Sequence, residues 1–141
     1  METDVIAPAG LADTRADQYS QARVEGRRVY VSGMVGRDEQ FDPVGDDTES
    51  QARRAFANVE TVLEAAGCGL EDVSTVTSYL VDAQQRYPAY ERVWKDVFEA
   101  EPYPCHTAVG VAELVREGFF IEIDVEAQLP RSSETERRDP E

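Results

Sequence analysis

The sequence predicts an α+β domain of two layers, in which two helices cover one face of a mixed β-sheet. Two segments carry apolar residues at helical spacing, and the stretches around them alternate apolar and polar residues as half-buried strands do. A helix with one apolar face needs a sheet face to cover, which gives the two layers. At 141 residues the chain is long enough for one core. We therefore expect a single domain over 18–129, after an N-terminal arm over 1–17 and before a disordered polar tail over 130–141.

The first strands form a hairpin that begins near Tyr19. Ala22 and Val24 precede a glycine-containing connection over 25–27, and a second strand follows over 28–35. Gly33 lies in the middle of this second strand. A glycine there is typical of a close approach by another backbone or a ligand.

The helices have recognisable ends. Thr48 to Gln51 fits a capping box, and Gly67 supplies the left-handed residue that ends the first helix. We expect Arg53 and the other charged residues of this helix to form a solvated face. We place Pro88 in the first turn of the second helix, whose apolar stripe is predicted to be core: Tyr90, Val93, Trp94, Val97 and Phe98.

Three more strands follow, over 73–81, 104–111 and 119–128. If the last two pair, His106, the chain's single histidine, lies in a strand adjacent to that of Glu122. Strand positions on the sheet face away from the helices are read as apolar. An uncovered apolar face predicts an oligomer whose sheets pack together.

The charge balance limits the partners. There are 29 acidic against 14 basic residues, a net charge of -15 that repels nucleic acids and anionic membranes. No apolar run reaches the roughly 20 residues of a membrane span, and no secretion signal opens the chain, so we expect a cytoplasmic protein. The acid-rich, lysine-poor composition suggests a high-salt cytosol, and this hypothesis predicts unfolding when salt is dialysed away.

The sequence predicts neither a metal nor an organic cofactor. One histidine with dispersed carboxylates is a poor set of transition-metal ligands. Cys68 and Cys105 are expected to be reduced, buried thiols. Cys105 and His106 are neighbours on one strand and face opposite sides, which disfavours a Cys–His nucleophilic pair.

These motifs together resemble the YjgF/Rid family, also called the endoribonuclease L-PSP family, whose founding activity is imine and enamine deamination. The matching segments are Tyr19-Ser20-Gln21-Ala22, Tyr30-Val31-Ser32-Gly33, Ala65-Ala66-Gly67, the strand over 73–81, Pro104-x-x-Thr107-x-Val109-x-Val111 and Ile121-Glu122-Ile123. The resemblance covers about residues 19–127. It implies a chorismate-mutase-like fold and a homotrimer with three clefts, each lined by two neighbouring subunits.

The resemblance also implies site residues. Tyr19, Ser32 and Gly33 match the family's cleft tyrosine, serine and glycine, and Glu122 matches its water-positioning glutamate. The remaining three cleft positions differ from the family: His106 replaces the arginine that binds the substrate carboxylate, Glu91 replaces an asparagine and Ala108 replaces a common cysteine.

The histidine changes the chemistry that the cleft can perform. Neutral histidine offers one donor and no charge, whereas arginine presents a charged fork to a carboxylate. Three roles remain open for His106. It is an imidazolium stabilised by Glu91 and Glu122, a neutral general base, or a residue that fills space and hydrogen-bonds a carbonyl.

We therefore expect a homotrimer that hydrolyses or binds a small imine, enamine or carbonyl metabolite, with Glu122 and His106 as catalytic candidates. Tyr19, Ser32, Gly33, Glu91 and Ala108 are the candidates for substrate binding. The alternative is a ligand-binding or chaperone-like trimer without catalysis. An endoribonuclease ranks last because the acidic surface repels RNA.

Overall fold

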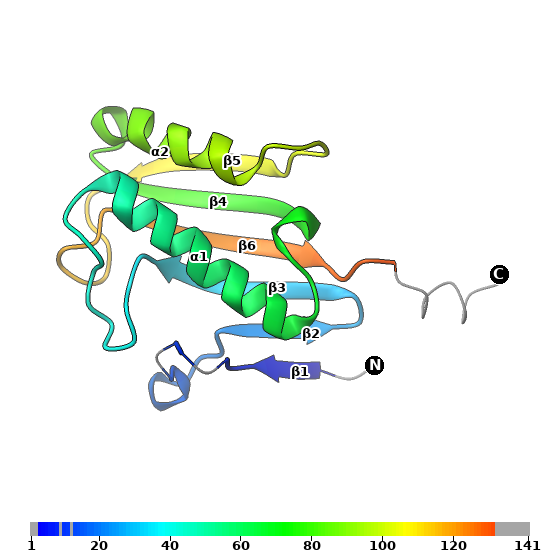
Figure 1. The fold of residues 1–141 in the computed structure, drawn as a ribbon. Helices are drawn as coiled ribbons and strands as arrows, with labels where there is room; N and C mark the ends of the chain where they lie inside the picture. The colour runs from blue at the N-terminus through cyan, green and yellow to red at the C-terminus, as the bar shows by residue number, and fades with distance from the viewer. Residues whose placement is uncertain (1–2, 9, 12, 132–141) are drawn as a thin grey trace.

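A computed structural model describes residues 3–8, 10–11 and 13–131 of the chain. These described residues form six strands and two α-helices, with a short 3-10 turn before β2 and another before β4; Figure 1 shows their arrangement. In chain order the elements are β1 (Thr3–Ile6), β2 (Ala22–Glu25), β3 (Arg28–Val35), α1 (Thr48–Ala66), β4 (Val73–Val81), α2 (Ala83–Val97), β5 (Cys105–Val111) and β6 (Ile121–Gln128).

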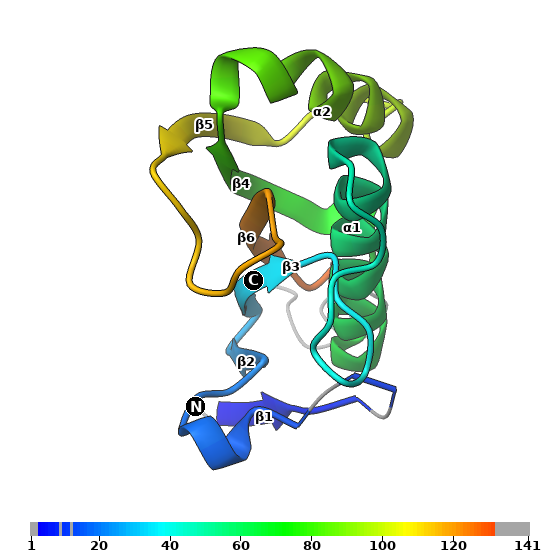
Figure 2. The ribbon, with the colours of Figure 1, turned by 90° about the vertical axis from the view of Figure 1, so that its left-hand side faces the viewer.

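The strands form one sheet in the order β1-β2-β3-β6-β4-β5. All neighbours are antiparallel except β4 and β5, which run parallel. Both helices lie on the same side of this sheet, and the loop from β5 to β6 lies on the other side (Figure 2). The predicted two-layer α+β architecture is confirmed.

The core lies between the helices and the sheet. β6 is central and strictly alternating, so its inward residues are buried: Ile121, Ile123, Val125 and Ala127. Phe56 and Leu63 of α1 pack onto them. α1 approaches β3 so closely that a Cβ on Gly36 would lie 2.3 Å from the carbonyl oxygen of Gln51. This contact fixes the helix over the strand that carries Ser32 and Gly33.

The expected pairing of the last two strands is wrong. β4 lies between β5 and β6, and Val76 of β4 is the residue opposite His106. The physical reason is the connection through α2, because strands joined by a crossover helix pair in parallel. The N-terminal segment contributes β1, which pairs with β2 at one edge of the sheet. From residue 132 onward, the predicted tail lies outside the described residues.

Both predicted helix starts need correction. The N-cap of α1 is Asp47, whose side chain accepts from the Ser50 amide at 2.7 Å, and not Thr48. Aspartate and threonine both cap helices well, so the sequence offered two adjacent candidates. α2 begins at Ala83, so Pro88 lies inside the helix. Proline favours a first turn, but good helix formers at 83–86 extend α2 before it.

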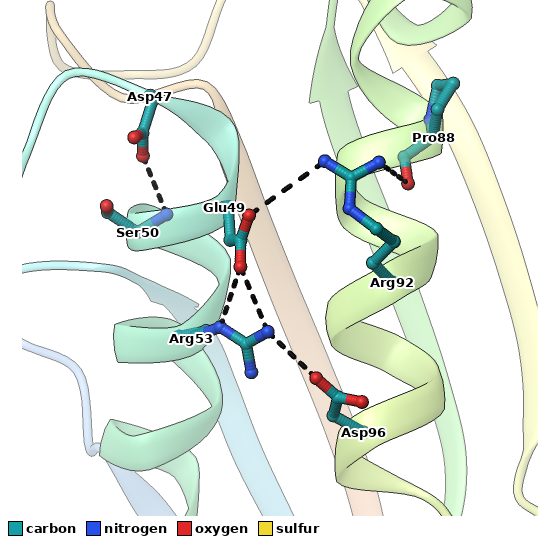
Figure 3. Close-up of polar contacts among 7 residues, drawn as sticks. All are labelled: Asp47, Glu49, Ser50, Arg53, Pro88, Arg92 and Asp96. Carbon is teal, nitrogen blue, oxygen red and sulfur yellow. Dashed lines mark hydrogen bonds and ion pairs between the residues drawn. The ribbon is translucent and has the colours of Figure 1, made fainter.

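Charged residues join the two helices on their outer side (Figure 3). Arg53 of α1 pairs with Glu49 at 3.0 Å and with Asp96 of α2 at 2.8 Å. Arg92 of α2 lies 3.9 Å from the same glutamate. The predicted solvated face of α1 is therefore also an exposed contact with α2, of the kind that salt screens.

The sheet face opposite the helices is more polar than predicted. β6 presents Glu122, Asp124 and Glu126 there, because these alternate with its buried residues. Apolar side chains on this face lie at its two edges, with Val109 (40% exposed) and Val111 on β5 and Val5 (56% exposed) on β1; Tyr30 of β3 is also exposed there. The apolar pattern was correct for these strands and wrong for β6 at the centre of the sheet.

The cysteines differ from the prediction in burial. Both are free thiols, but Cys105 is exposed and Cys68 only half-buried. The strand register places Cys105 on the open face and His106 on the helix face, in agreement with the strand argument. Within the described part of the chain, no helix is long and apolar enough to cross a membrane.

Candidate functional site

Four of the predicted site residues line one cavity of about 470 Å³: Tyr19, Ser32, Gly33 and Glu122. They come from the segment before β2, from β3 and from the start of β6. The loops that follow β3 and β5 complete the walls, with Phe41 from the first and Arg116 from the second. The structure thus brings together the four residues that kept the family pattern.

Backbone and hydroxyl hydrogen bonds hold the first wall of this cavity. The Thr14 hydroxyl donates to the Tyr19 carbonyl at 2.7 Å, and Tyr19 itself is 41% exposed. The Ser32 hydroxyl donates to the Ser20 carbonyl at 2.6 Å, and the Ser32 amide donates to the Gln21 carbonyl at 2.9 Å. Ser32 therefore fastens the segment before β2 to β3.

Gly33 makes room for the Glu122 carboxyl group. A Cβ built on Gly33 would lie 2.0 Å from Glu122 Oε2 and 3.0 Å from its Cδ. Here β3 pairs with β6 across an irregularity between Val31 and Met34. The predicted close approach at Gly33 is therefore made by a side chain of the neighbouring strand.

The environment of Glu122 favours its protonated form. Burial raises the pKa of this carboxyl group above its ordinary value of 4.5, and the nearby Asp124 raises that pKa further. Asp124 itself accepts a hydrogen bond from the Tyr79 hydroxyl at 2.9 Å. A carboxylate with a raised pKa is a better base toward water at neutral pH.

Gln51 of α1 organises the cavity, although sequence reasoning assigned its amide to the capping box. Its nitrogen donates to the Gly45 carbonyl at 3.1 Å and to the Gly118 carbonyl at 2.8 Å, and its oxygen accepts from the Phe120 amide at 2.8 Å. Gln51 is fully buried, so one amide group joins both cavity loops to α1. The signal available in the sequence was a polar residue in line with the apolar face of the helix.

His106 lies elsewhere, beneath α2 on the helix face of the sheet. Its ring stacks on Trp94 with centroids 3.9 Å apart. Its Nε2 atom shares a hydrogen bond with the Ser78 hydroxyl at 3.0 Å, and Ser78 is in turn hydrogen-bonded to Tyr90. This chain of buried hydroxyls fixes the orientation of the ring.

The surroundings of His106 favour neutral imidazole. Burial lowers the pKa of His106 below its ordinary value of 6.5. Glu122 belongs to the other face of the sheet, and Glu91 lies 3.9 Å from Lys95 on the outside of α2. The hypothesis that these two carboxylates stabilise an imidazolium is therefore wrong within one chain, since strand alternation puts Glu122 on the opposite face and Glu91 lies on the outside of α2.

A second cavity of about 590 Å³ is lined by His106 and Ala108 together with Tyr87 and Pro88 of α2. Glu91 lines neither this cavity nor the first one. β5 is an edge strand, and Ala108 and Val109 are exposed on it. The predicted site residues thus form two groups on opposite faces of the sheet.

The residues that the structure describes contain no cluster of three or more histidine, cysteine, aspartate or glutamate side chains able to hold a metal ion. The polar groups that line the first cavity are hydroxyl groups, the carboxyl groups of Asp17 and Glu122, and guanidinium groups. They suit a small polar organic ligand.

The chain combines two features. Its sheet has the order β1-β2-β3-β6-β4-β5, and in a surface cavity Glu122 lies against Gly33 of the neighbouring strand. The sequence profile described as Endoribonuclease L-PSP matches residues 12–129. The chain belongs to this family, as its resemblance to YjgF/Rid proteins led us to expect.

Relatives cover most of the chain. The RutC family protein YjgH of Escherichia coli is 39% identical over 92% of this chain and 98% of its own length. A 2-iminobutanoate/2-iminopropanoate deaminase of Dermatophagoides farinae is 35% identical over 77% of this chain and 84% of its own.

Solved structures agree with the fold. The structure of protein YjgH has a TM-score of 0.84 at 38% identity and covers 94% of this chain and 100% of its own. The structure of RidA from an Antarctic Psychrobacter has a TM-score of 0.79 at 30% identity, covering 89% and 98%.

Proposed function

We propose that the protein hydrolyses a small imine or enamine to the corresponding carbonyl compound and ammonia. The observation that carries this proposal is the cavity that unites Glu122 with Gly33, Ser32 and Tyr19. Relatives named 2-iminobutanoate/2-iminopropanoate deaminase support the reaction class.

In this mechanism the Glu122 carboxylate holds a water molecule against the imine carbon and accepts its proton. The new C–O bond gives a carbinolamine. The imine enters protonated, so its C=N π electrons pass to nitrogen as the C–O bond forms and the carbinolamine is neutral. Glu122 then returns the proton to this nitrogen, the C–N bond breaks, and ammonia leaves. Glu122 accepts the hydroxyl proton as the carbonyl group forms and releases it to the departing ammonia or to solvent. A single carboxyl group can act in both directions because its raised pKa lies closer to neutrality.

The active unit is a homotrimer in this proposal, with a cleft between neighbouring subunits. One chain places Glu122 and His106 on opposite faces of its sheet. A cleft that uses both groups therefore takes Glu122 from one subunit and His106 from the next. The exposed apolar edge at β5 supports association there, because an uncovered edge strand of this kind is a contact surface.

The alternative is a trimer that binds a metabolite without hydrolysing it. One observation favours it: the His106 ring is stacked on Trp94 and hydrogen-bonded to Ser78, as a residue that fills space would be. A neutral imidazole also binds a substrate carboxylate more weakly than an arginine does.

The test is hydrolysis of freshly generated 2-iminobutanoate above its spontaneous rate. The wild type should accelerate hydrolysis, and Glu122→Gln should lower the acceleration by at least about a hundredfold through loss of proton transfer. Glu126→Gln is the matched control, because Glu126 lies on the same face of β6 outside both cavities. Activity that appears only in His106→Arg would favour the binding protein, and inactivity of all four proteins would contradict hydrolysis.

A further inference from the structure

The cavity that contains Glu122 also has a buried cation in its wall. Arg37 follows the end of β3, lines the cavity and is only 3% exposed. Arginine is rarely this buried without a partner of opposite charge. The sequence does not indicate that Arg37 is buried, because an arginine in a loop with charged neighbours is usually solvated.

The contacts of Arg37 leave part of its guanidinium group unsatisfied. Nη2 donates to the Met34 sulfur at 3.7 Å, and the group lies over the Phe41 ring at 4.3 Å from its centroid. Nη1 is buried and has no hydrogen-bond partner among the described residues. No carboxylate of that part of the chain lies within 4 Å of Arg37. A buried charge without a counterion is costly and calls for an anion.

A second cation contacts the same ring. The guanidinium group of Arg116, from the loop between β5 and β6, lies 4.1 Å from the Phe41 centroid. Arg116 is exposed and lines the same cavity. Two positive groups on one ring repel each other, and an anion between them would offset this repulsion. Asp17 and Glu122 also line this cavity, so the positive charge is concentrated on the wall around Phe41.

The backbone holds Arg37 in place. The buried Asn58 side chain of α1 donates to the Arg37 and Val35 carbonyls, each at 3.1 Å. The Arg37 amide donates to the Val35 carbonyl at 2.9 Å. Its position is therefore set before any ligand arrives, which lowers the cost of binding.

We propose that Arg37, with Arg116 at the rim, is an anion subsite that binds the carboxylate of a small 2-oxo or 2-imino acid within one subunit. The inference rests on the proposed function in that it uses the Glu122 cavity. It places the ligand's carboxylate on the loop after β3, away from the position on β5 where His106 stands. The carbon next to the carboxylate then lies toward Glu122 in the same cavity.

The experiment is a calorimetric titration of the full chain with 2-oxobutanoate and with its uncharged amide. Arg37→Gln should weaken binding of the acid by about tenfold to a hundredfold, the loss of one charge-assisted bond. Its binding of the amide should change by less than about twofold. Arg86→Gln is the matched control and should change neither, because Arg86 also lies over an aromatic ring, Phe120 at 3.7 Å, but lines neither cavity.

A folded Arg37→Gln protein that binds the acid as tightly as the wild type would overturn the subsite. If this variant does not fold, the arginine Nε–Hε resonance of Arg37 in wild-type protein gives the answer. It should shift with 2-oxobutanoate and not with the amide, and an unchanged resonance would overturn the inference. Acid binding without imine turnover would uphold the subsite and reject hydrolysis, whereas turnover unaffected by Arg37→Gln would do the reverse.

Discussion

Replacing Gly33 by alanine puts a methyl group where the Glu122 carboxyl group lies. The added carbon would stand 2.0 Å from Oε2, about 1 Å closer than real contacts allow, so the carboxyl group must move by at least that much. A displacement of about 1 Å at a reacting group can cost about a hundredfold in rate. We expect kcat/KM for 2-iminobutanoate to fall by about that factor.

Stability should change little in the same variant. The clash involves the end of a flexible side chain, and the φ angle of Gly33 lies outside the left-handed region. Alanine in place of glycine also lowers the conformational entropy of the unfolded chain, which stabilises the folded state by about 0.4–1 kcal/mol. The melting temperature should therefore stay within about 4 °C of the wild type.

The assay is a two-by-two comparison of Gly33→Ala and Glu122→Ala, alone and combined, in imine hydrolysis. If the methyl group acts by moving the carboxyl group, it should have almost no further effect once that group is absent. A Gly33→Ala protein with wild-type activity would refute this reasoning. So would an undiminished effect of Gly33→Ala in the Glu122→Ala background.

Three other changes test separate parts of the structure. His106, as the single histidine, should titrate in an NMR experiment with a midpoint below 6.5, since burial disfavours its charged form; a midpoint of about 7 or above would contradict the stacked, neutral ring. Glu122→Gln should raise the melting temperature at pH 8. The pKa of Glu122 is higher in the folded state than in the unfolded state, so the ionised group destabilises the fold at a pH above both values. The gain in melting temperature should shrink as the pH falls toward 4.5, and a gain that grew on acidification would contradict this sign. Gln51→Leu should cost about 2–4 kcal/mol in the free energy of unfolding measured with urea, because it leaves the Phe120 amide and two carbonyls unpaired; a loss below about 1 kcal/mol would show that the loops do not depend on this amide.

Local patterns predicted most of the elements. The structure confirms the features that depend on neighbouring residues. These are the hairpin of β2 and β3, the length of α1 with its end at Gly67, and the alternation of β4 and β6. The helix starts at Asp47 and Ala83 were harder, since several adjacent residues can cap or begin a helix.

Strand order was the main failure. The pairing of β5 with β4 depends on the connection through α2, which patterns within single strands do not report. The crossover rule could have supplied it, and would have separated His106 from Glu122.

The lining of the Glu122 cavity was predictable where it resembles the family and not elsewhere. Tyr19, Ser32, Gly33 and Glu122 were placed by motif, whereas Gln51 and Arg37 act through contacts between distant segments. Such contacts exist only after the chain has folded. Arg37 in particular carries the same charge and loop context as a solvated arginine, and only its burial distinguishes it.

Complementation between Glu122→Gln and His106→Ala, each of which should be inactive if both groups act in one cleft, tests most directly whether neighbouring subunits share that cleft. Glu122→Gln and His106→Ala proteins are unfolded together, refolded as a mixture and assayed for imine hydrolysis beside each parent. If each cleft takes Glu122 from one subunit and His106 from the next, random mixing should restore about a quarter of the clefts of the wild type. Activity of the mixture no greater than the mean of its parents would contradict a cleft built from two chains.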